Sequence, residues 1–199
     1  MIKQKKIILI GGATRNVGKT TFSCAVIDNL SKKHHIIGLK IKTLYRGDDV
    51  FHGKDHNPLS GNYRIIEEFE QNGKEDTMRM LKAGAKQVFR IKAKNEYLSE
   101  AFDDFFRQIP KNSFILCESN SLRKIVKPSV FLMIKHKYSI EIKPSAKELE
   151  HLADKIIFTN GEKHDFDIKD IIIENGQWSL KDKSKKTKIE SKKAKDKLI

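Results

Sequence analysis

The residues with the clearest chemical meaning lie near the amino terminus, in the segment Gly11-Gly12-Ala13-Thr14-Arg15-Asn16-Val17-Gly18-Lys19-Thr20-Thr21. The segment follows the apolar run Ile7-Ile8-Leu9-Ile10 and precedes a helical pattern, which is where a phosphate-binding loop belongs. The motif of such loops is Gly, four residues and then Gly-Lys-Ser/Thr. Gly18-Lys19-Thr20 fits its end, and Ala13 fills its first position behind two glycines. We therefore expect an ordinary backbone conformation at Ala13.

These residue types suit the binding of a nucleoside triphosphate. A tight turn from strand to helix points consecutive backbone N–H groups at phosphate oxygens, and the helix adds the positive end of its dipole. Lys19 would reach the β- and γ-phosphates, and the Thr20 hydroxyl would coordinate Mg²⁺, which prefers oxygen ligands. The expected contacts are Ala13, Thr14, Arg15, Asn16, Val17, Gly18, Lys19, Thr20 and Thr21. The alternative is a glycine-rich turn that binds no ligand.

A second chemical position is Glu118, directly after the apolar run at residues 113–117. Nucleotide-hydrolysing sites use an acidic residue at the end of a buried strand to hold Mg²⁺ opposite the threonine of the loop. We therefore expect Lys19, Thr20 and Glu118 to form the catalytic group, with Thr20 and Glu118 at the metal. The alternative is a glutamate that faces solvent or pairs with a lysine. Ser119, Asn120, Ser121 and Arg123 follow and could meet a substrate or a second phosphate.

Alternating strand and helix patterns must position these residues. A strand at 6–10, a helix at 19–33 and a strand at 35–42 form one βαβ unit. Helices are expected within 63–82, with an interruption around Asn72-Gly73, and at 96–109 and 145–153. Strands are expected at 87–92, 113–117, 130–135, 155–159 and 170–174. Residues 138–142 extend or flank a strand, and Asn175-Gly176 predicts a hairpin to 177–180. This alternation predicts an α/β, P-loop NTPase-type three-layer fold, with a mostly parallel sheet and helices on both faces.

Composition favours one domain over residues 1–180 followed by a basic, disordered tail at 181–199. The 199-residue chain has a formal net charge of +14, of which nine lysines and three acidic residues place +6 in the tail. The tail contains neither arginine nor aromatic residues, so a solvated tail is favoured over a nucleic-acid contact. The chain has no apolar stretch of bilayer length, and a cytoplasmic protein is expected. Cys24 and Cys117 predict small buried residues.

The segment 43–61 is predicted to be a long loop that overhangs the phosphate site, because Gly47, Gly53, Pro58 and Gly61 interrupt any regular pattern. Three aspartates and two histidines lie in it: Asp48, Asp49, Asp55, His52 and His56. The spacing of the histidines binds zinc well on a helix, but the glycines and the proline argue against a helix here. A solvated loop with one carboxylate linked to Mg²⁺ or to a substrate is the favoured interpretation.

Together these features resemble the MobB family, whose members are GTP-binding adaptor proteins of molybdopterin-guanine dinucleotide biosynthesis. The resemblance spans most of residues 7–160 and rests on four features: the phosphate loop, the lysine-bearing second strand, the stretch Asp76-Thr77-Met78-Arg79-x-x-x-Ala83-Gly84-Ala85, and the strand end at Glu118 followed by Lys127-Pro128-Ser129-Val130. It implies GTP and Mg²⁺ as ligands, with Lys19 and Thr20 at the triphosphate and Glu118 as the acidic contact. The family's lysine after the second strand corresponds to Lys42 or Lys40.

The chain departs from the family pattern at two places. Thr43-Leu44-Tyr45-Arg46 stands where members usually carry histidines, and Ile157-Phe158-Thr159-Asn160 continues as Gly161-Glu162-Lys163 in place of a guanine-reading Asn-Lys-x-Asp motif. The expectation of GTP over ATP therefore follows from the resemblance. Lys42 and Asn160 are the further expected nucleotide contacts.

The leading functional hypothesis is an accessory protein that binds GTP with Mg²⁺, hydrolyses it slowly and docks to a molybdenum-cofactor enzyme, with a homodimer also possible. Slow hydrolysis is expected because the loop contains only Arg15 as an internal arginine. The first alternative is a P-loop small-molecule kinase or ATP-dependent ligase, in which Arg46, Lys54, Arg64 or Arg79 binds an anionic substrate. The second is an RNA-binding module that uses the tail; it predicts salt-sensitive binding that is lost on truncation at residue 181.

Overall fold

The structure is a computed structural model that describes residues 2–46 and 59–181. Its strands are β1 (Ile2–Gly12), β2 (Ile36–Leu44), β3 (Tyr63–Glu67), β4 (Gln87–Lys94), β5 (Phe114–Glu118), β6 (Val126–His136), β7 (Lys155–Thr159), β8 (Ile171–Glu174) and β9 (Gln177–Leu180). The α-helices are α1 (Lys19–Leu30), α2 (Asp76–Lys82), α3 (Leu98–Gln108) and α4 (Pro144–Lys147). The short 3₁₀ helices are η2 (Asn95–Tyr97), η3 (Ser121–Lys124), η4 (Glu150–Leu152) and η5 (Ile168–Asp170).

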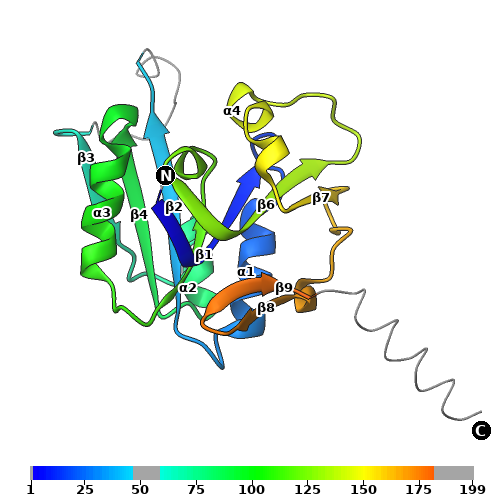
Figure 1. The fold of residues 1–199 in the computed structure, drawn as a ribbon, viewed down its shortest axis with the longest axis horizontal. Helices are drawn as coiled ribbons and strands as arrows, with labels where there is room; N and C mark the ends of the chain where they lie inside the picture. The colour runs from blue at the N-terminus through cyan, green and yellow to red at the C-terminus, as the bar shows by residue number, and fades with distance from the viewer. Residues whose placement is uncertain (1, 47–58, 182–199) are drawn as a thin grey trace, which may run out of the picture.

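A seven-stranded sheet with the order β3-β4-β2-β5-β1-β6-β7 forms the centre of the molecule (Figure 1). Its strands pair in parallel except at one edge, where β3 is antiparallel to β4. β8 and β9 form a separate antiparallel pair. The predicted α/β class with a mostly parallel sheet is confirmed.

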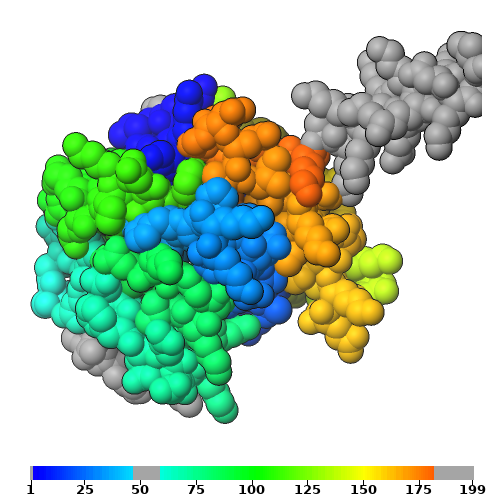
Figure 2. Space-filling model, turned by 90° about the horizontal axis from the view of Figure 1, so that it is seen from below, coloured from blue at the N-terminus to red at the C-terminus, as the bar shows by residue number. Residues whose placement is uncertain are grey.

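The central strands of the sheet carry buried apolar side chains on both faces, and other elements pack against each face. In β1, Ile7 and Leu9 join one core cluster and Ile8 and Ile10 join the other, as the two-residue period of a strand requires. The first cluster includes the aromatic side chains of α3, and the second includes α1, α2 and the β8–β9 hairpin. Figure 2 shows the hairpin (orange) beside α1 (blue) on the surface of this second side. Phe102 and Phe105 of α3 are thus core residues, whereas Phe106 is 38% exposed.

The largest correction concerns the helix expected within 63–82. Its first part is the edge strand β3, with Tyr63 opposite Ala93 and Glu67 opposite Phe89, and only Asp76–Lys82 is helical. The β-branched pair Ile65-Ile66 favours a strand, and pairing with β4 satisfies the backbone of this segment. The Tyr63 hydroxyl also donates a hydrogen bond to Asp104 of α3. Tertiary pairing therefore overrides a weak helical pattern here.

Smaller differences lie near the carboxyl end of the sheet. Residues 138–142 form no strand, and the helix expected at 145–153 is broken into α4 and η4. β6 is longer than expected because its first residues pair with the start of β1. The hairpin at Asn175-Gly176 is confirmed, and both residues have the positive φ angles (50° and 70°) that its tight turn needs.

Several sequence expectations fall outside the described residues. They include most of the loop expected at 43–61, with Asp48, Asp49, Asp55, His52 and His56, and the tail beyond Lys181. Within residues 2–46 and 59–181, no His, Cys, Asp and Glu side chains form a group of three or more that could hold a metal ion. In the same residues, no helix has both the length and the apolar character needed to cross a membrane.

The two cysteines are inert residues of the protein interior. Cys117 is fully buried, and Cys24 is partly buried on α1. Burial raises the pKa of the Cys24 thiol to about 11 and raises the pKa of Cys117 as well. Both therefore stay protonated at neutral pH, as expected of buried packing residues.

Candidate functional site

The candidate site lies at the carboxyl end of the sheet, between β1 and β5. After β1 the chain passes to α1 on one face, whereas after β5 it passes to η3 on the other face. Where neighbouring parallel strands send their connections to opposite faces, a crevice opens beyond the strand ends, and ligands bind there in open α/β sheets. The topology therefore places the glycine-rich loop and Glu118 on the two sides of one crevice.

The glycine-rich loop turns sharply and brings Lys19 into the first turn of α1. Gly18 has φ +85°, a conformation that suits glycine, and it caps α1 with its carbonyl, which accepts a hydrogen bond from the Phe22 N–H at 3.0 Å. A Cβ on Gly12 would lie 2.8 Å from the Lys19 side chain, so glycine permits the lysine to lie across the strand end. Ala13 has no positive φ, as predicted, and its N–H donates to the carbonyl of Ile134 at 2.8 Å.

Thr20 and Glu118 meet at the base of the crevice. The Thr20 hydroxyl donates a hydrogen bond of 3.1 Å to Oε2 of Glu118, and both residues are buried. The second oxygen of Glu118, Oε1, is buried and has no hydrogen-bond partner in the described protein. A buried carboxylate oxygen without a partner is costly unless a cation or water satisfies it. The Thr20 hydroxyl and the Glu118 carboxylate are hard oxygen donors of the kind that Mg²⁺ prefers, so these two residues could hold that ion.

Lys40 joins this group from β2. In the sheet, Lys40 of β2 pairs with Glu118 of β5, and Glu118 pairs with Ile10 of β1, so the three residues form one row across three strands. The Lys40 ammonium is 3.9 Å from Oε2 of Glu118 and forms an ion pair with Asp76 of α2. Lys42 lies two residues farther along, beyond the last residue of β5. The register thus brings Lys40, rather than Lys42, to Glu118.

A cleft of about 410 Å³ includes Thr20 and Lys40 in its lining, whereas the buried Glu118 lies behind them. Its lining is Arg15, Asn16, Gly18, Lys19, Thr20, Thr21, Lys40, Asp76 and Arg79, a set that contains four cationic side chains and one carboxylate. Arg79 closes one side, where it donates a hydrogen bond of 3.1 Å to the Thr21 hydroxyl. Burial lowers the pKa of Lys19 and of Lys40, and nearby Glu118 partly opposes this for both. The four cationic side chains against one carboxylate give the lining an excess of positive charge, which favours an anionic ligand.

A second recess of about 430 Å³ lies beside the loop, at the ends of β6 and β7. It is lined by Lys137, Tyr138, Phe158, Thr159, Asn160, Lys163, His164 and Asp165. His164 connects the two recesses, because its Nε2 is 3.4 Å from the position that a Cβ on Gly18 would occupy. Asn160, which the sequence suggested as a nucleotide contact, therefore lies in the neighbouring recess and not in the cleft.

The chain was compared with family models, curated proteins and solved structures. No match was found in any of the three.

Two residues shape the loop in ways that sequence reasoning did not predict: Asn120 was expected at a substrate or second phosphate, and Lys143 was not singled out. The Asn120 side chain accepts the Gly12 N–H at 2.9 Å and donates to the Gly12 carbonyl at 3.2 Å, so it fixes the end of β1 from the neighbouring strand connection. Lys143 reaches the loop from the β6–α4 connection and donates its backbone N–H to Ala13 at 2.9 Å. Burial, then the nearby Lys19 and Arg15, lower the pKa of Lys143 to about 8. No local sequence signal predicts these contacts with the loop, because both residues are far from the loop in the sequence and reach it only in the folded chain.

Replacing Asn120 tests this support of the loop. Asn120→Ala leaves the N–H and carbonyl of Gly12 without their partners, and we expect a loss of about 1–3 kcal/mol in the free energy of unfolding. Urea denaturation measures this loss. Asn72→Ala, at an exposed asparagine in the turn before α2, is the control and should change little. An Asn120→Ala protein as stable as the wild type would show that the paired hydrogen bonds do not hold the loop.

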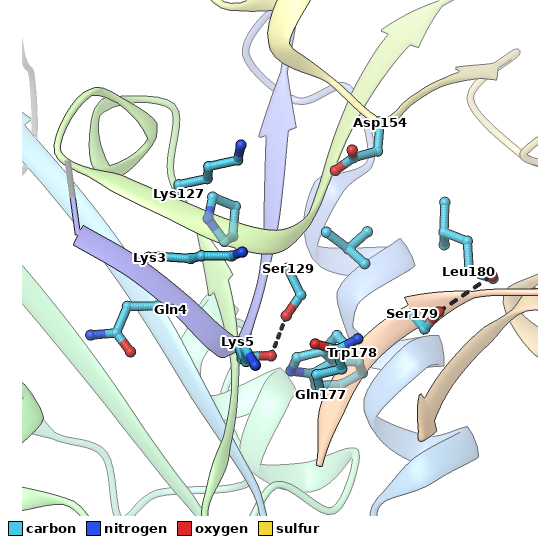
Figure 3. Close-up of a pocket in the computed structure, with 12 residues that line it drawn as sticks. Lys3, Gln4, Lys5, Lys127, Ser129, Asp154, Gln177, Trp178, Ser179 and Leu180 are labelled. Carbon is cyan, nitrogen blue, oxygen red and sulfur yellow. Dashed lines mark hydrogen bonds between the residues drawn. The ribbon is translucent and has the colours of Figure 1, made fainter. Parts of the chain in front are cut away.

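A third recess, of about 340 Å³, lies at the opposite end of the sheet, where β1 and β6 begin (Figure 3). Lys3 and Lys127 line it from the sheet and Trp178 lines it from β9. Trp178 is buried and donates a hydrogen bond of 3.0 Å from its indole N–H to the Lys6 carbonyl. Lys19 and Glu118 lie at the other end of the sheet. This recess lies where the β8–β9 hairpin packs against β1 and β6.

Proposed function

We propose that the chain is a P-loop protein that binds GTP with Mg²⁺, hydrolyses it slowly and assists molybdenum-cofactor biosynthesis through a partner enzyme. The observation that carries the nucleotide part is the buried hydrogen bond between Thr20 and Glu118, next to the glycine-rich loop and Lys19. This is the arrangement in which a loop hydroxyl and a strand-end carboxylate hold Mg²⁺ opposite a triphosphate. A glycine-rich turn that binds no ligand would not require a buried carboxylate such as Glu118 beside it.

Each group in the cleft has a role in this proposal. The backbone N–H groups of the loop and the start of α1 would bind the phosphate oxygens, and Lys19 would contact the terminal phosphates. Mg²⁺ held by Thr20 and Glu118 would neutralise charge on the phosphate oxygens. Arg15 lines the cleft and is the internal arginine of the loop. Turnover is expected to be slow until a partner completes the site.

The second recess supports a purine base beside the triphosphate. Tyr138 and Phe158 supply flat apolar surface, and Asn160 and Asp165 supply polar groups. The Asn160 side-chain oxygen accepts the N–H groups of Glu162 and Lys163, which orients its amide nitrogen away from that turn. Guanine offers an acceptor at O6 and donors at N1 and N2, so an amide donor and a carboxylate acceptor suit guanine better than adenine.

Titration of GTP and ATP with Mg²⁺ by calorimetry tests this function. We expect GTP to bind about tenfold more tightly than ATP, the effect of one additional hydrogen bond. Asp165→Asn should remove the difference and leave the affinity for ATP unchanged. Asp167→Asn is the control, because Asp167 is exposed two residues away, outside the lining of the recess, and its side chain accepts the Lys169 N–H. Absence of binding by either nucleotide would overturn the proposal, and a preference for ATP would remove GTP from it.

The role in cofactor biosynthesis rests on the resemblance to the MobB family. Of the stretch 76–85 that contributes to this resemblance, Asp76 and Arg79 line the cleft. These residues also support the alternative function, a small-molecule kinase or ATP-dependent ligase, because Arg79 is placed to bind an anionic acceptor. Of the other candidates, Arg64 donates to Ser60, Arg46 is exposed, and Lys54 lies outside the described residues. Transfer of phosphate from the nucleotide to a metabolite would favour the alternative over the adaptor.

A further inference from the structure

The Lys40 ammonium occupies an unusual position between two carboxylates and next to a hydroxyl. It forms an ion pair with Oδ2 of Asp76 and lies 3.9 Å from Oε2 of Glu118. The same oxygen of Glu118 accepts the Thr20 hydroxyl at 3.1 Å. Three oxygen-bearing side chains, from β5, α1 and α2, therefore gather near the Lys40 ammonium, and Arg79 lies 3.7 Å from Oδ1 of Asp76 on the outer side.

The surroundings of this charge resemble a divalent-cation site. Two carboxylates and a hydroxyl are hard oxygen donors of the kind that Mg²⁺ and Mn²⁺ prefer. Oε1 of Glu118 is buried without a partner, so the ammonium satisfies the carboxylate only in part. The side chain of Asp76 is 35% exposed, which leaves it room to turn toward an incoming cation, whereas that of Glu118 is 1% exposed.

We propose that Lys40 and the divalent cation exchange on one pair of carboxylates, with Asp76 as an oxygen ligand of the metal in addition to Thr20 and Glu118. The proposal deepens the nucleotide-binding function and rests on it for the role of the metal. Like charges in close contact repel, so a divalent cation at these carboxylates and the Lys40 ammonium exclude each other. Lys40 lines the same cleft as Lys19 and, once released, is placed to contact the terminal phosphate of a bound nucleotide.

This exchange gives a reason for the lysine that pairs with Glu118 across β2 and β5. Without a ligand, the ammonium limits the repulsion between the Asp76 and Glu118 carboxylates. With metal and triphosphate present, the same ammonium gains a new anionic partner. The metal and the terminal phosphate would then favour each other's binding through Lys40, and the site would distinguish a triphosphate from a diphosphate.

The test measures Mn²⁺ binding to the nucleotide-free protein by electron paramagnetic resonance. Lys40→Met removes the competing charge, and we expect it to bind Mn²⁺ at least about tenfold more tightly than the wild type. Adding Asp76→Asn to Lys40→Met should abolish this gain. The controls are Lys82→Met, at the exposed end of α2, and Glu148→Gln in the Lys40→Met background, which removes an exposed carboxylate outside the cleft. Neither control should change the affinity for Mn²⁺.

Two results would overturn the exchange. One is an unchanged affinity for Mn²⁺ in Lys40→Met, and the other is a gain that persists when Asp76 is replaced. Thermal unfolding checks that each variant folds, and Lys40→Gln replaces Lys40→Met if the latter does not. Failure of the proposed function gives a different result, since a wild-type protein that binds neither GTP nor ATP refutes nucleotide binding. The Mn²⁺ comparison uses no nucleotide, so it still tests the exchange in that case.

Discussion

Lys19→Ala is expected to lower the affinity for GTP and ATP by about 100-fold or more, because it removes a charge-assisted contact of about 3 kcal/mol to the terminal phosphates. The fold should be unaffected. Burial lowers the pKa of Lys19, so the folded protein holds its charged form at a cost that the unfolded chain does not have. The thermal midpoint of Lys19→Ala should therefore equal or exceed that of the wild type.

Calorimetric titration with each nucleotide in Mg²⁺, together with a thermal melt, measures both effects of Lys19→Ala. Lys127→Ala is the matched control, since Lys127 is exposed at the amino-terminal end of the sheet, away from the cleft. It should alter neither affinity nor stability. Unchanged nucleotide binding in Lys19→Ala would refute the assignment of the glycine-rich loop as a phosphate site.

Glu118→Gln is expected to abolish the dependence of nucleotide affinity on Mg²⁺. Glutamine has nearly the same shape and can keep a hydrogen bond to Thr20, but it lacks the charge that binds the metal. In Mg²⁺ the affinity should fall by about 10- to 100-fold. In EDTA it should stay the same or rise, because a negative charge has been removed from beside the phosphates. Titrations with and without Mg²⁺ distinguish these effects.

The control for Glu118→Gln is Glu148→Gln, which removes an exposed carboxylate that pairs with Lys124. It should leave the Mg²⁺ dependence intact. If Glu118→Gln lowers the affinity equally in Mg²⁺ and in EDTA, Glu118 supports the loop structurally and does not hold the metal.

The elements that the sequence predicted correctly are those with strong local signals. The apolar run before the loop, the glycines at its turn and the apolar run before Glu118 place β1, the start of α1 and the end of β5 correctly. Each signal lies within a few residues of the feature it predicts. The helix expected within 63–82 is confirmed at Asp76–Lys82 but was wrong for Tyr63–Glu67, because that part obtains its backbone hydrogen bonds from β4, which is distant in the chain.

The remaining site residues depend on contacts between distant parts of the chain. Lys40 reaches Glu118 only because β5 inserts between β1 and β2 in the sheet. Asp76 reaches Lys40 through the packing of α2, and Asn120 reaches Gly12 across a sequence separation of 108 residues. The order of strands in a sheet is not encoded in any local periodicity.

The sequence by itself determined the loop, its lysine and threonine, and an acidic strand end, because short-range backbone and side-chain chemistry dictates those patterns. Only the tertiary structure decided that Thr20 and Glu118 share a buried hydrogen bond and that Lys40, not Lys42, stands between Glu118 and Asp76. The physical reason is the register of parallel strands. It aligns Lys40 with the last residue of β5, and a shift of two residues would carry Lys42 there instead.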